Sequence, residues 1–66
     1  MALSARSREV LGLLARGHTA AEVAHRLRIS EETVSTHRRN LMRKLGLRNK
    51  AELIRYALER GIGLPD

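Results

Sequence analysis

The sequence predicts an all-α, bundle-like domain of four helices, two of which form a helix-turn-helix. Capping residues and glycines divide the chain into four segments, and within each segment apolar residues recur at helical spacing. No segment shows the alternation of a β-strand. Sixty-six residues suffice for one small domain with one core. We therefore expect a single domain over residues 1–66, with helices at about 5–16, 20–27, 31–45 and 50–60 and a short tail at 61–66.

The first helix is expected after Ser4, whose side chain can cap a helix N-terminus. Val10, Leu11 and Leu14 then share one face of the helix, which indicates the side that packs on the core. Gly17 follows at a position that favours the left-handed conformation in which many helices end.

The second and third helices are expected to lie close together, because only residues 27–30 join them. Thr19 and Glu22 have the spacing of a capping box at the start of the second helix. Ser30 can cap the third helix, and two glutamates follow it at the positive end of the helix dipole. Two short helices across such a turn form a helix-turn-helix, whose second helix can enter the major groove of DNA.

The third helix is expected to end at Gly46, and Asn49 with Glu52 is expected to cap the fourth. The fourth helix would run to Gly61, after which the sequence "IGLPD" is interpreted as a tail.

Charge indicates the kind of partner. Thirteen Lys and Arg residues against seven Asp and Glu give a formal charge of +6 and a pI near 11.4. This balance favours a polyanion, either a nucleic acid or an anionic membrane surface. The chain has no cysteine, so a disulfide framework and a cysteine zinc site are excluded. It shows no apolar run of about 20 residues and no signal peptide, so we expect a cytoplasmic protein.

The third helix has two different sides on a helical wheel. Val34, Leu41 and Leu45 fall together and should face the core. Short hydroxyl side chains opposite them would let the backbone approach a duplex, and long arginines could reach guanine edges or phosphates. The alternative is a solvated charged face with no ligand. The opposite side consists of Glu32, Thr36, Arg39 and Arg43, flanked by Thr33, Ser35 and Asn40.

The stretch "LSARSREVLGLLARGHTAAEVAHRLRISEETVSTHRRNLMRKLGLRNKAELIRYAL" resembles the LuxR-type DNA-binding domain of bacterial transcription regulators. Its most specific parts are "ISEETVSTH", "NLMRKLGLRN" and "AEL". The resemblance implies sequence-specific binding of double-stranded DNA by a dimer, for transcription regulation. In that family the domain is usually the output end of a response regulator or a quorum sensor, and some members stand alone. A sensory or receiver domain N-terminal to these residues is therefore compatible with the resemblance.

Carried over by position, the resemblance implies base contacts from Ser35, Thr36 and Arg39. His37 lies between the apolar and exposed sides of the wheel, so we expect it to be half-buried and mainly a packing residue. Arg38 is expected at the edge of the core, without a specific role. The resemblance implies phosphate contacts from Thr19, Thr33, His37, Asn40, Arg43 and Lys44.

The sequence departs from the family pattern at two positions. Ser7 stands where the family usually has Glu, which removes the reciprocal half of a capping box. Arg28 stands where the family commonly has Gly, so an arginine is expected at positive φ or the turn is built differently.

The fourth helix has a wide apolar face. Leu53 and Ala57 should face the core, and Ala51, Ile54 and Leu58 extend the apolar arc beyond one core contact. A self-complementary surface would use this surplus, so we expect a weak homodimer that forms preferentially on DNA. The alternative is a wide stripe buried within a very small domain.

Other functions are weaker interpretations. A sigma-factor-like helix-turn-helix has similar length and leucine spacing, and the fourth helix alone could serve a protein-interaction module. A membrane-surface peptide would need one long amphipathic helix with bulky aromatics, whereas this chain has only Tyr56. His18, His25 and His37 stand on separate elements, so we expect no metal site. No residues suggest an ordered catalytic group, so we expect neither an enzyme nor a cofactor.

Overall fold

The computed structural model describes residues 3–62, and all regular structure within them is α-helical. The four helices are α1 (Ala5–Ala15), α2 (Ala20–Leu27), α3 (Glu31–Leu45) and α4 (Lys50–Glu59). The predicted fold class is confirmed. The helices α1 and α4 each end one residue earlier than the sequence indicated.

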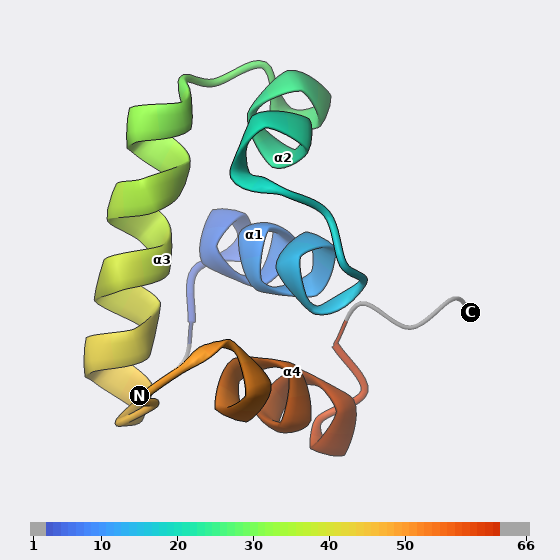
Figure 1. The fold of residues 1–66 in the computed structure, drawn as a ribbon, viewed down its shortest axis with the longest axis vertical. Helices are drawn as coiled ribbons and strands as arrows, with labels where there is room; N and C mark the ends of the chain where they lie inside the picture. Colours follow the sequence, from blue (N-terminus) through green and yellow to red (C-terminus); the bar gives the residue numbers. More distant parts are fainter. Residues whose placement is uncertain (1–2, 63–66) are drawn as a thin grey trace.

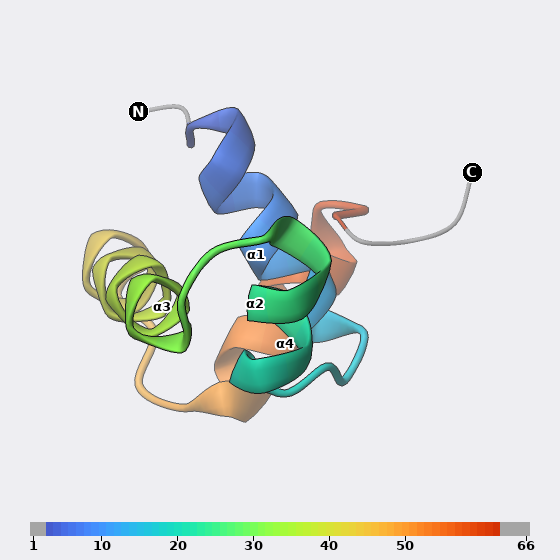
Figure 2. The same cartoon turned by 90° about the horizontal axis from the view of Figure 1, so that it is seen from above.

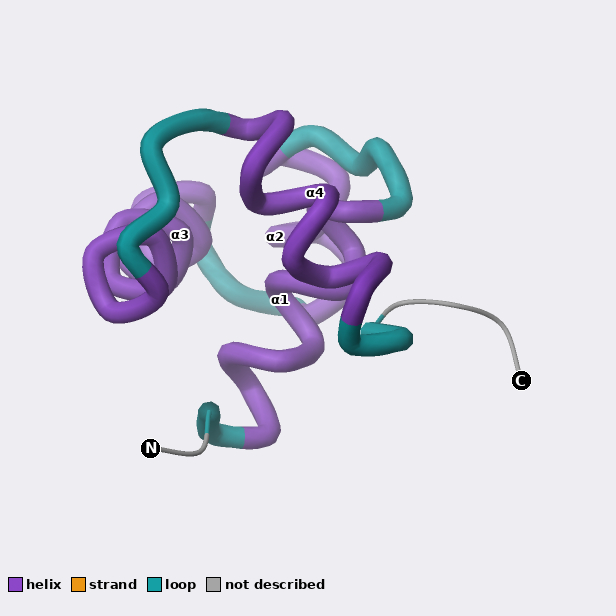
Figure 3. Tube along the Cα trace, turned by 90° about the horizontal axis from the view of Figure 1, so that it is seen from below, coloured by secondary structure: helices purple, strands orange, loops and turns teal. Residues whose placement is uncertain are grey.

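The helix α1 lies at the centre of the domain and packs against the other three (Figure 1). The helix α3 forms one edge of the molecule and is seen end-on from above (Figure 2). The helix α4 crosses the underside next to α1 (Figure 3). The buried apolar residues come from all four helices and from the segment after α4: Val10, Leu11, Leu14, Val23, Ala24, Val34, Leu41, Leu53, Ala57 and Ile62.

Each helix begins with a residue of extended backbone whose side chain accepts a hydrogen bond from the third residue of the helix. Thr19 and Glu22 form the predicted capping box, with Thr19 N donating to Glu22 Oε1 over 2.8 Å. Asn49 caps α4, but the Glu52 carboxylate accepts from the backbone N–H of Arg48, outside the helix. At α1 the hydroxyl of Ser4 donates to the hydroxyl of Ser7 over 3.0 Å. Ser7 therefore bonds to the side chain of the cap residue, whereas a capping-box glutamate would bond to its backbone N–H.

All four helices end in the same way. A residue at positive φ follows the helix, and the next residue donates its backbone N–H to the carbonyl five residues back, at 2.8–3.1 Å. This arrangement satisfies carbonyls that the helix itself leaves unpaired. Gly17, Gly46 and Gly61 hold the positive-φ position in three helices, and Arg28 holds it after α2 with φ 58° and ψ 46°. Of the two alternatives given for Arg28, a positive φ or a turn built differently, the structure has the positive φ.

The segment predicted as a tail begins inside the core. Gly61 turns the chain back at φ 69°, and Ile62 donates its N–H to the Ala57 carbonyl over 2.8 Å. The Ile62 side chain is buried. The prediction of a tail is therefore wrong at residues 61 and 62, and the remainder of it, 63–66, lies outside the described residues.

Candidate nucleic-acid interface

The helix α3 presents one side to the core and the other to solvent. Val34 and Leu41 are fully or almost fully buried against the rest of the domain, and Leu45 is half-buried. The short turn after α2 places the beginning of α3 at the top of the molecule, and the remaining turns run along its outer edge (Figure 1). The outer side of α3 is therefore available along its whole length.

The residues expected to contact DNA lie on this outer side or next to it. His37 is half-buried, as its place on the helical wheel indicated. Thr19 is exposed at the N-terminus of α2. The exposed set on α3 consists of Thr33, Ser35, Thr36, Arg39, Asn40, Arg43 and Lys44.

Two of the threonine hydroxyls are already engaged within α3. The hydroxyls of Ser30 and Thr33 share a hydrogen bond of 2.7 Å, and Ser30 also accepts from the Thr33 N–H over 3.0 Å. The Thr36 hydroxyl donates to the Glu32 carbonyl over 3.0 Å. A hydroxyl has one hydrogen and two lone pairs, so Thr36 can still accept a hydrogen bond but cannot donate a second. In a major groove it would suit the amino group of adenine or cytosine, or a thymine methyl.

The basic side chains of α3 have no acidic partner within the described part of the chain. The three ion pairs among residues 3–62 all lie elsewhere: Arg6–Glu9 at 3.8 Å, His18–Glu22 at 3.8 Å and Arg55–Glu59 at 3.9 Å. The only acids of α3 are Glu31 and Glu32 in its first turn, where they stabilise the positive end of the helix dipole. The cationic charge of the later turns is therefore available to a ligand.

Arg38 lies on the flank of α3, at the edge of the core as expected, and its side chain is exposed. It borders a depression formed between α3 and the first residues of α2 and α4, which Lys50 also lines. Sequence reasoning gave no role to Lys50, because residues 38 and 50 stand on separate helices and only the fold brings them together.

The proposed contact face of α4 is partly exposed. Leu58 is 53 % exposed and is the only large exposed hydrophobic residue among residues 3–62. Ala51 is exposed and Ile54 half-buried, while Leu53 and Ala57 are buried in the core. Of the apolar residues that the sequence placed outside the core contact, Ile54 thus packs partly against the core, whereas Leu58 is exposed to solvent.

Residues 3–62 contain no group of three or more His, Cys, Asp or Glu side chains that could hold a metal ion. None of their helices combines the length and apolar character needed to cross a bilayer. Among residues 3–62, the one titratable group with a clear shift is Glu22, where the hydrogen bond from the Thr19 backbone N–H lowers the carboxyl pKa.

An all-α domain that contains a helix-turn-helix, with a second helix that is basic on its outer side, is typical of the class of helix-turn-helix regulatory domains. The family described as "Bacterial regulatory proteins, luxR family" matches residues 1–57. The chain belongs to this family. No solved structure gives a significant match.

Two relatives illustrate the relationship. The "Transcriptional regulatory protein MctR" of Rhizobium johnstonii is 48 % identical over 60 residues, which cover 91 % of this chain and 28 % of that protein. The "Oxygen regulatory protein NreC" of Staphylococcus aureus is 45 % identical over 58 residues, which cover 88 % of this chain and 27 % of that protein. The chain therefore spans less than a third of the length of these relatives.

Proposed function

We propose that this domain binds double-stranded DNA in a sequence-specific manner and regulates transcription, with α3 in the major groove. Family membership supports DNA-binding transcription regulation as the general role. The observation that carries the finer proposal is the outer side of α3, where basic side chains without an acidic partner among residues 3–62 follow the short hydroxyls of the first two turns. An α-helix of about 10–12 Å diameter fits a major groove about 12 Å wide.

In this proposal the length and position of each exposed side chain determine whether it contacts bases or phosphates. Ser35 and Thr36 are short and lie where the helix would be closest to the base edges, and Arg39 can bind the O6 and N7 atoms of guanine with two hydrogen bonds. The longer or more lateral residues would bind phosphates, which fix the position of the helix but carry no sequence information. The proposed phosphate contacts are Thr19, Thr33, His37, Asn40, Arg43 and Lys44.

The domain is also proposed to dimerise weakly through Ala51, Ile54 and Leu58 of α4. Leu58 supports this, because it is the largest apolar side chain left open on the described surface. The patch is far smaller than a standard interface of about 1,200–2,000 Å², so pairing would need DNA to hold two copies together. Two copies would then occupy inverted half-sites about one helical turn apart.

The test is selection of bound sequences from a random duplex pool, followed by fluorescence anisotropy on the selected site and on a shuffled duplex. The proposal predicts a shared motif and an affinity for it at least about 10³-fold above that for the shuffled duplex. A pool that yields no motif, with equal and weak affinity for both duplexes, would exclude specific DNA binding by this chain.

A further inference from the structure

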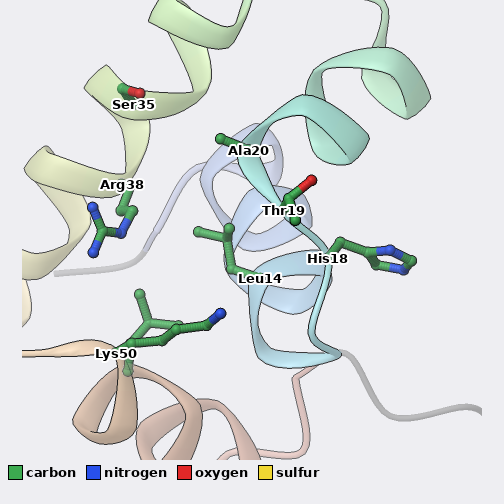
Figure 4. Close-up of a pocket in the computed structure, with 8 residues that line it drawn as sticks. Leu14, His18, Thr19, Ala20, Ser35, Arg38 and Lys50 are labelled. Carbon is green, nitrogen blue, oxygen red and sulfur yellow. The ribbon is translucent and has the colours of Figure 1, made fainter.

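The depression between α2, α3 and α4 has a basic rim and an apolar floor. It encloses about 200 Å³, and its floor includes the buried side chains of Leu14 and Leu53. Arg38, from α3, and Lys50, from the first turn of α4, both line it, and Figure 4 shows their side chains on two sides of the depression. The imidazole of His18 points away from that space. The residues that line the depression include no carboxylate.

Both cations of the rim are available for a ligand. Arg38 and Lys50 are exposed, and neither takes part in an ion pair among residues 3–62. Two like charges that face one space repel each other unless an anion lies between them. The depression therefore has the chemistry of a site for a phosphate or another oxyanion.

The position of the depression indicates which phosphate it would bind. Ser35, a proposed base contact, and Thr19, a proposed phosphate contact, both line it. On the wheel of α3, Arg38 and Ser35 lie about 40° and 100° to one side of Val34, whereas Asn40 and Lys44 lie about 120° and 80° to the other. A helix in the major groove has one DNA strand along each flank. The phosphate contacts proposed on α3 at Asn40 and Lys44 serve one flank, and the depression lies on the opposite one.

We infer that Arg38 and Lys50 together bind one backbone phosphate of the DNA strand that runs along the α2 side of α3. This inference rests on the proposed function and extends the DNA interface to the N-terminus of α4. The neighbouring deoxyribose would lie over Ala20, a partly exposed apolar residue that also lines the depression. Contact through α4 would also fix the angle at which the recognition helix enters the groove, because α4 and α3 would be held on one strand.

The first experiment removes charge from the DNA backbone and from the two basic side chains, separately and in combination. A duplex with one selected half-site is prepared with single methylphosphonate linkages, each of which replaces a charged phosphate oxygen by a methyl group. We expect one linkage on the α2-side strand to weaken binding of the wild type but to have no effect on the double variant Arg38→Gln/Lys50→Gln. A single half-site is used so that dimer contacts through α4 do not contribute.

The second measurement is the salt dependence of the same binding. Because both cations serve one phosphate, the double variant should lose about 0.9 units of the slope of log K against log salt. Between 50 and 200 mM salt this corresponds to about a 3.5-fold smaller loss of affinity than in the wild type. The matched control is Arg26→Gln, which makes the same charge change at an exposed residue near the other end of α2. It should keep the wild-type profile.

The outcomes separate the inference from the function on which it rests. If the double variant keeps the wild-type slope and linkage profile while Arg43→Ala weakens binding, the inference is wrong and DNA binding stands. If the wild type shows no salt-dependent duplex binding, both fail. Titration with inorganic phosphate at constant ionic strength, followed through the backbone amide signals of Ser35 and Lys50, tests a free anion as the source. Saturation without DNA that competes with the duplex would overturn assignment of the site to the DNA backbone.

Discussion

Replacement of Arg28 by glycine is expected to stabilise the domain. Arg28 occupies the positive-φ position that glycine holds at the other three helix ends, with φ 58°. A non-glycine residue in this region is strained by about 1–2 kcal/mol, because its Cβ approaches the following carbonyl. The Arg28 side chain is exposed and forms no ion pair among residues 3–62, so its removal loses no such contact.

The magnitude follows from two opposing effects. Relief of strain favours glycine by about 1–2 kcal/mol, and the greater freedom of glycine in the unfolded chain opposes it by about 0.4–1 kcal/mol. The net stabilisation is about 0.8 kcal/mol in the middle of the resulting range. For a domain of this size, that difference raises Tm by about 3–6 °C. Thermal unfolding followed by circular dichroism at 222 nm, a wavelength that reports helix, measures it directly.

Arg26→Gly is the matched control. The same substitution two residues earlier lies within α2, where the backbone is α-helical and glycine has no strain to relieve. It should destabilise the domain by about 0.8–1 kcal/mol and lower Tm by several degrees. The opposite signs of the two variants test the reasoning. A fall in Tm for Arg28→Gly similar to that for the control would show that the turn is not strained at Arg28.

The remaining predictions concern binding and pH. Arg39→Ala should cost about 1–3 kcal/mol on the selected site and relax preference at one base pair, whereas Arg43→Ala should weaken all duplexes alike and reduce the salt slope by about one unit; unchanged base preference in the Arg39 variant would contradict its role. Leu58→Glu should abolish cooperative two-to-one binding in a gel-shift titration without unfolding the domain, and cooperative binding by that variant would exclude α4 as the dimer surface. The lowered pKa of Glu22 means that its carboxylate stabilises the fold above its ordinary value of 4.5 and that this contribution is lost as pH falls through the lower folded-state value. The stability difference between the wild type and Glu22→Gln should therefore shrink below pH 4.5, and a difference that stays constant to pH 2 would contradict the linkage.

The features of the fold that depend on near neighbours were predictable from the sequence. A cap and its partner lie three residues apart, so Thr19 and Glu22 could be paired before any tertiary contact was known. The positive φ of Arg28 was one of two alternatives, and it was suggested by the resemblance to a family that commonly has Gly at this position. A helical wheel could identify the outer side of α3, because the buried residues Val34 and Leu41 define the inner side.

The errors arose where the chain turns back on itself. Ile62 was assigned to a tail because it follows Gly61 and lies close to a proline, and both residues commonly mark the end of structure. The motif that ends these helices, however, places the residue after the glycine against the last turns, where an apolar side chain can pack. An isoleucine directly after the glycine was therefore a usable signal. No such local signal shows that Arg38 and Lys50 line the same depression, because their placement depends on how α3 and α4 pack on α1.

The separation of folding and binding residues decides how clearly binding variants can be interpreted. The core consists of buried apolar side chains and contains no buried polar or charged residue among residues 3–62. The proposed DNA contacts on α3 are exposed, with one exception, so their removal should change affinity with little effect on stability. Thr19 differs, because it also caps α2 and its removal would destabilise that helix. The exception on α3 is His37, which is half-buried on the flank of the helix. A loss of DNA binding on its replacement would combine weaker packing with any lost phosphate contact, and only affinity measured at equal folded fraction can separate the two.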